Sequence, residues 1–300
     1  MPSATRRLAA AIALTSATLV AAGCGGGGSA TGSGQAKTSR AQLLPQQIVR
    51  APRHVVSAAE PQSNGIIWTL AGRKSAGLYE IDPTSDRVMG SFSVSAAARS
   101  VAESSPGILG LALGSKTSGA LELFDGRTSK AIKTVPLPAP ARYVTLGSDG
   151  TTFYVLSGWA HSASVTLVNS QNGVVRGTVA VPADTVSVAP DVPQTDLYVL
   201  ERNGLISDIS ISGGAAPSRF SIGRDHGRSL ALSPDGSTLY VLKGTPAVAN
   251  VAVVDVATQS VRRVLPAPSH CVQVLISASG KQLYEVAGTR HYGNIQIFAV

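Results

Sequence analysis

Basic side chains recur at intervals of about 43 residues, each at or just before a short apolar run. They are His54, Arg99, Arg142, Arg228 and His270, and Thr185 holds the corresponding place between Arg142 and Arg228. Arginine recognises carboxylate and phosphate groups through paired donors, and imidazole can act as a base or a metal ligand. If the fold brings these positions together, they form a positively charged site for an anionic small molecule.

Three more residues complete the candidate ligand-binding set: Trp159 and His161 in GWAHSAS, and His291. An exposed Trp is typical of contact with a ligand or a partner, although it can also cover the fold. His226, His270 and Cys271 could in principle converge on zinc or copper, but no HxH or CxxC spacing supports a metal site, and Cys271 fits a small buried residue better. We expect no metal and no cofactor, and no GxSxG or similar motif identifies a catalytic residue.

The elements that must position these residues form a repeat. Its copies are LYVLKG at 239–244, LYVLER at 197–202, FYVLSG at 153–158, LYEVAG at 283–288, and the weaker IWTLAG at 67–72 and LGLALG at 109–114. In each unit an apolar strand and a turn such as SPDG precede this segment, and two more strands follow it. Four short strands in every 43 residues or so predict the blade of a β-propeller.

The fifth unit carries LALSPDG, LYVLKG and VAVVDVATQSV, which resemble the YVTN-type β-propeller repeat. The resemblance covers residues 54–300, although the chain lacks the Thr-Asn that follows LYV in that family and its second unit is degenerate. It implies an all-β fold of four-stranded antiparallel blades, and the units predict six blades, with seven as the alternative. Such propellers include binding proteins, surface lipoproteins and a few enzymes, so the fold does not fix an activity.

The last unit ends after its third strand, so the final blade needs a strand from elsewhere in the chain. The best candidate is QLLPQQIVR at 42–50, in which Pro45 suits an edge strand. We therefore expect the propeller domain to span residues 42–300, closed by an N-terminal strand.

The first 23 residues have the pattern of a bacterial lipoprotein signal peptide. Arg6 and Arg7 precede an uncharged run, and Cys24 follows Ala-Ala-Gly in a segment that resembles a lipobox, with Ala21 where Leu is preferred. Cleavage by ordinary signal peptidase is the alternative. Residues 24–41 are rich in Gly and Ser and predict a flexible tether. Acylation of Cys24 would anchor the protein outside the cytoplasm, on the bacterial cell membrane.

The net charge of +8 belongs largely to the N-terminal region, since 19 Lys and Arg balance 17 Asp and Glu from His54 onward. Because the domain is nearly neutral and only 5% of the chain is aromatic, a nucleic-acid partner is not expected. We expect a monomer.

In a propeller, the loops that precede inner strands share one face with the loops between second and third strands. All five histidines and the repeated arginines would lie on this face, around the mouth of the central channel; alternatively, the arginines cap carbonyls of neighbouring blades.

We expect a binding or interaction module for an anionic small molecule or a cell-envelope protein. A lactonase-like or lyase-like enzyme with a histidine base on this face is the alternative. Asp235 and Asp149 belong to turns on the opposite face and are expected to have no chemical role.

Overall fold

The computed structural model describes residues 44–59, 65–72, 75–105, 107–159, 162–213, 216–223 and 225–300. The predicted signal peptide, Cys24 and the tether lie outside these residues, and so does His161. In the described ranges, all of the regular secondary structure is β-strand. No helix in this part of the chain is long and apolar enough to span a membrane.

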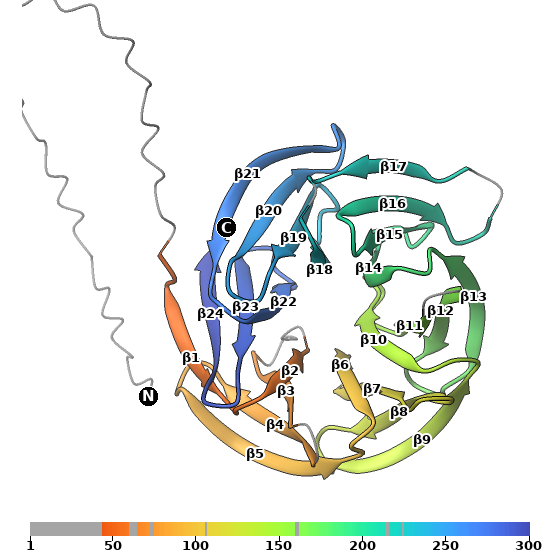
Figure 1. Cartoon of the computed structure of the whole chain (residues 1–300). Helices are drawn as coiled ribbons and strands as arrows, with labels where there is room; N and C mark the ends of the chain where they lie inside the picture. Colours follow the sequence, from red (N-terminus) through yellow and green to blue (C-terminus); the bar gives the residue numbers. More distant parts are fainter. Residues whose placement is uncertain are drawn as a thin grey trace, which may run out of the picture. The chain divides into compact units, whose positions relative to one another are not determined.

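Six four-stranded antiparallel sheets are arranged as the blades of a β-propeller (Figure 1), which confirms the predicted fold and blade number. Blade 1 contains β2 (Val55–Ala58), β3 (Ile67–Ala71), β4 (Ala76–Asp82) and β5 (Arg87–Val94). Blade 2 contains β6 (Ala98–Ser104), β7 (Ile108–Gly114), β8 (Gly119–Asp125) and β9 (Lys130–Leu137). Blade 3 contains β10 (Ala141–Leu146), β11 (Thr152–Trp159), β12 (Ser162–Asn169) and β13 (Val175–Val181).

The second half of the ring repeats this order from the inner to the outer strand. Blade 4 contains β14 (Thr185–Pro190), β15 (Asp196–Glu201), β16 (Leu205–Ser210) and β17 (Ser218–Ser221). Blade 5 contains β18 (Gly227–Leu232), β19 (Thr238–Gly244), β20 (Ala249–Asp255) and β21 (Ser260–Ala267). Blade 6 contains β22 (Cys271–Ile276), β23 (Gln282–Gly288), β24 (Gly293–Ala299) and, as its outer strand, β1 (Gln47–Ala51).

The strand sequences follow from this layering. Second strands such as β11 are buried along nearly their whole length because blades pack against both of their faces. Outer strands such as β9 and β21 are mostly exposed and carry Lys and Arg, which discourage edge-to-edge pairing.

An N-terminal strand closes the ring, as the sequence predicts, although it begins at Gln47 rather than at Gln42. In β1, the fully buried Val49 pairs with Ile295 of β24. The backbone N–H of Arg50 also donates to Asp86 Oδ1 of blade 1 at 2.6 Å. Strand β1 thus joins the last blade to the first.

A ring of hydrogen bonds joins the inner strands. Ser57, Ser100, Ser187 and Ser229 each accept, through Oγ, the backbone N–H of the next blade at 3.1–3.3 Å. Gln273 Oε1 accepts the N–H of Ala58 at 2.8 Å and so joins blade 6 to blade 1. In blade 3 the corresponding residue is Tyr143. The buried polar side chains therefore satisfy backbone donors that face a neighbouring blade and not their own sheet.

Candidate anion site at the channel mouth

A β-bulge near the start of each inner strand determines which side chain lines the channel. Strand pairing skips one residue between Ala98 and Ser100, and the same irregularity recurs in every inner strand. A bulge leaves its extra residue out of the ladder and redirects that residue's side chain. The residues skipped in the six blades are Val56, Arg99, Arg142, Val186, Arg228 and Val272.

These six bulge residues line a narrow cavity of about 90 Å³, which we call the arginine mouth. Of the six positions that the sequence predicts at the channel mouth, the structure brings Arg99, Arg142 and Arg228 together in this lining. The other three positions lie outside it. His54 and His270 stand two residues before the bulge and Thr185 stands one before it, so valines occupy the lining positions of blades 1, 6 and 4.

Arg142 is held by a hydrogen bond to blade 4 and by a contact with Trp159. Its Nη1 donates to the Thr185 carbonyl of blade 4 at 2.9 Å, so the predicted capping of a neighbouring blade does occur. Its guanidinium carbon lies 4.3 Å from the centroid of the Trp159 ring. Its Nε and Nη2 are buried and have no hydrogen-bond partner among the described residues. One nitrogen therefore holds the side chain in place, and two buried donors stay without a partner in the described structure.

The electrostatics of the mouth favour an anion. Burial, assisted by the charge of Arg202 and opposed by Asp184, lowers the pKa of Arg142 to about 10, so the side chain stays protonated at neutral pH. Burial also lowers the pKa of Arg228, whose Nη1 is buried without a hydrogen-bond partner in the described structure. None of the three arginines forms an ion pair with a described carboxylate. Their positive charge is thus left without a direct counter-charge in this part of the chain.

A wider cavity of about 720 Å³, here the Trp159 cavity, adjoins the mouth. Arg99 and Arg142 line both cavities, and Lys116 and Trp159 line the wider one. Trp159 is 57% exposed. Sequence reasoning missed Lys116, which carries no signal beyond its place in the loop between β7 and β8.

The described histidines do not line the mouth. His54, His226 and His270 precede inner strands and His291 lies between β23 and β24, as predicted. His54 and His270 have φ values of 58° and 60°, a backbone region in which histidine is enriched, so local conformation explains these two residues. His291 Nε2 accepts a hydrogen bond from Arg290 Nε at 2.8 Å. Neither cavity has a described histidine in its lining.

Cys271 belongs to the hydrophobic core and not to a site. It is fully buried, and burial raises the pKa of its thiol to about 12. Among the described residues, no cluster of three or more His, Cys, Asp or Glu could hold a metal ion.

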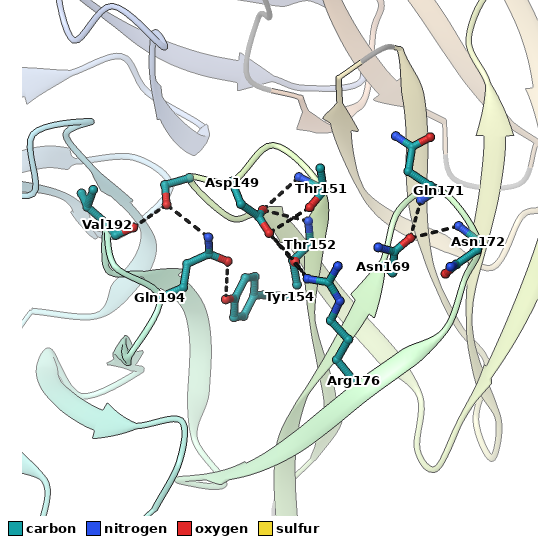
Figure 2. Close-up of polar contacts among 11 residues, drawn as sticks. Asp149, Thr151, Thr152, Tyr154, Asn169, Gln171, Asn172, Arg176, Val192 and Gln194 are labelled. Atoms are coloured by element: carbon teal, nitrogen blue, oxygen red, sulfur yellow. Dashed lines mark hydrogen bonds and ion pairs between the residues drawn. The ribbon is translucent and has the colours of Figure 1, made fainter.

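A third cavity, of about 320 Å³, lies toward the opposite face, where the sequence predicts only turns. Its lining contains no charged side chain and includes Tyr143, which also contributes to the arginine mouth. A hydrogen-bonded network holds one wall (Figure 2): Ser148 Oγ donates to the Val192 carbonyl at 2.6 Å, and Tyr154 donates to Gln194 at 2.8 Å.

The aspartates of the turns on this opposite face have the structural role predicted for them. Asp149 accepts hydrogen bonds from Thr151 and Thr152, and its Oδ2 lies 3.6 Å from Arg176 Nη1 (Figure 2). Asp235 accepts hydrogen bonds from Ser233 and Ser237.

The fold and the site together define a six-bladed β-propeller with a basic channel mouth of about 90 Å³. By sequence, the chain matches no protein-family model and no curated protein. By structure, it is similar to the hydrazine synthase of Kuenenia stuttgartiensis, with a TM-score of 0.64 and 13% identity over 81% of this chain and 83% of that one. At this identity the similarity supports the propeller fold alone.

Proposed function

We propose that this protein is a binding module that receives an anionic group in the arginine mouth. The observation that carries the proposal is the set of buried guanidinium donors of Arg142 and Arg228 without hydrogen-bond partners in the described structure. A buried donor left unpaired costs about 1–3 kcal/mol, and more when it is charged. A phosphate or carboxylate has several acceptor oxygens, so its binding would satisfy these donors and neutralise the charge.

We also propose that the protein acts outside the cytoplasm as a monomer, held to the bacterial cell membrane through acylated Cys24. The lipobox-like segment and the Gly- and Ser-rich stretch after it support this proposal. Incorporation of a labelled fatty acid into the wild-type chain, and its loss in Cys24→Ser, would test it. As an alternative to a small molecule, an acidic side chain of a cell-envelope protein would supply the anion that binds in the arginine mouth.

The alternative, a lactonase-like or lyase-like enzyme, needs a base near the bound anion. The described lining of the mouth consists of Arg, Ser, Val, Tyr and Gln, with neither a carboxylate nor an imidazole. This composition is better suited to holding an anion than to moving a proton, so binding is the favoured function.

Calorimetric titration of the full chain with inorganic phosphate tests the proposal. We expect binding by the wild-type protein and a loss of at least about tenfold in affinity for the double variant Arg142→Gln/Arg228→Gln, because both donor sets are removed. Arg219→Gln, an exposed arginine of the outer strand β17, is the matched control and should bind as the wild type does. Equal affinity of the double variant and the control, or no binding by the wild type, would refute the proposal.

A further inference from the structure

We propose that the ligand is an organic anion joined to a flat ring: the charged group enters the arginine mouth while the ring stacks on Trp159. This inference rests on the proposed function, because it assumes that the mouth binds the anion. It adds the chemical class of the rest of the ligand. Three features carry it: the two cavities that share Arg99 and Arg142, the placement of Trp159, and the comparison of blade 3 with the other blades.

The two cavities differ in size and share a wall. The mouth is about 90 Å³ and the Trp159 cavity about 720 Å³, and both are lined by Arg99 and Arg142. A small charged group fits the narrow part, whereas the wide part has room for a much larger attached group. Lys116 adds another positive charge beside the wide part. A ligand that fills both must be charged at one end.

Trp159 is held in place although it is exposed. It is the last residue of β11, whose other residues are all buried, and it pairs with Ser162 of β12. The preceding Gly158 has a φ of +92°, and a Cβ there would lie 2.2 Å from the Ser162 carbonyl oxygen. The chain thus makes a tight turn that only glycine permits. The guanidinium of Arg142, 4.3 Å from the ring centroid, fixes the indole further.

The other blades show what the fold itself requires at this position. The residues that correspond to Trp159 in blades 2, 5 and 6 are Ser115, Thr245 and Thr289, each directly after the glycine that ends the second strand. Each hydroxyl accepts backbone N–H groups of its own loop at 3.0–3.4 Å. Tryptophan has no oxygen to offer, so blade 3 gives up this loop-stabilising contact.

The exposed indole of Trp159 therefore does not stabilise its loop as the hydroxyl groups of the other blades do. A role in stacking on the ring of a ligand would account for it. The rest of the cavity lining suits such a role, because it consists mostly of small residues around the ring: Ala96, Ala97, Gly114, Ser115, Pro140 and Ala141. Aromatic rings prefer offset stacking on indole, and the ring faces attract nearby cations such as Arg142.

The test compares inorganic phosphate, phenyl phosphate and phenol as ligands of the full chain, by calorimetry and by tryptophan fluorescence. We expect phenyl phosphate to bind about three- to tenfold tighter than inorganic phosphate and phenol to bind far more weakly. Phenyl phosphate should also change the emission of Trp159, the exposed member of the two tryptophans in the chain.

Trp159→Ala should abolish the preference for phenyl phosphate while phosphate still binds, and Trp159→Phe should restore part of it. Tyr292→Ala, which removes an aromatic ring that is 38% exposed in the corresponding loop of blade 6, is the matched control and should keep the preference. Equal affinities for phosphate and phenyl phosphate would overturn the inference and leave the proposed function intact. An equal loss of both ligands in Trp159→Ala would also overturn it, because Trp159 would then act only through Arg142. No phosphate binding by the wild type would overturn both proposals.

Discussion

Replacing Glu285 with glutamine should remove a large part of the pH dependence of stability of the propeller. Glu285 lies in β23, the second strand of blade 6, with 1% of its surface exposed. Both of its carboxylate oxygens are buried without a hydrogen-bond partner in the described structure. The corresponding residues of blades 3, 4 and 5 are Val155, Val199 and Val241. A carboxyl group thus occupies a position that three other blades fill with valine.

The size of the effect follows from the pKa. Burial raises the pKa of Glu285 from 4.5 to about 8. The folded protein therefore holds the proton more tightly than the unfolded chain does. The stabilising contribution is complete below about pH 4.5 and is lost as the pH rises through about 8. At about pH 8, ionisation should cost on the order of 4 kcal/mol of unfolding free energy, or a fall in Tm of roughly 10 °C for a domain of this size.

Thermal unfolding followed by circular dichroism, from about pH 5 to about pH 8.5, measures this loss. Glu285→Gln should unfold close to the wild-type temperature at the acidic end and well above it at the alkaline end. Part of the fall in Tm with rising pH, here the pH slope, should remain in the variant, because burial and the charge of Glu80 raise the pKa of Glu103 to about 7. The exposed Asp184→Asn is the control and should keep the wild-type slope. If Glu285→Gln also keeps that slope, the reasoning is refuted.

Two further predictions concern how the ring is held together. Val49→Asp should lower Tm by more than about 10 °C, because it buries an unpaired carboxylate in the closing strand, whereas Ile48→Asp, on the 54% exposed neighbour, should change Tm little. An equal effect of the two would show that β1 does not seal the ring. Ser229→Ala should cost about 1–3 kcal/mol in urea unfolding, because the buried N–H of Val274 loses its acceptor. Ser91→Ala, on an exposed outer strand, is the comparison, and an equally small effect of both would argue against the ring of hydrogen bonds.

The blade architecture could be predicted from the sequence because it depends on local patterns. Segments such as LYVLKG and turns such as SPDG recur in register, and their spacing fixes the number of strands in each unit. The closing strand was predicted because the last unit has only three strands, whereas each blade needs four. The predicted signal peptide and the acylation of Cys24 stay predictions, because they lie outside the described residues.

The site was only partly predictable, because the register of the inner strands was misjudged in two blades. Taking His54 and His270 as the equivalents of Arg99 placed them two residues before the bulge residues Val56 and Val272. The bulge recurs in every inner strand, so these two histidines fall outside the lining of the mouth. The buried donors of Arg142 without partners were invisible in the sequence, because they depend on the packing of neighbouring blades. Trp159 was predictable, since a large aromatic residue in a polar loop is conspicuous.

Comparison of equivalent positions in the six blades separates structural from functional residues, which neither sequence motifs nor cavity volumes do. Positions that are alike in most blades show what closing and packing the ring requires, and a residue that departs from its counterparts has to be explained by something else. Trp159 stands where hydroxyl residues cap loops in blades 2, 5 and 6. Tyr143 stands where a Ser or Gln accepts a backbone N–H of the next blade in the other five blades. Both departures belong to blade 3, which also contributes Arg142 to the mouth, so the asymmetry of the fold concentrates beside the surface where we propose that the ligand binds.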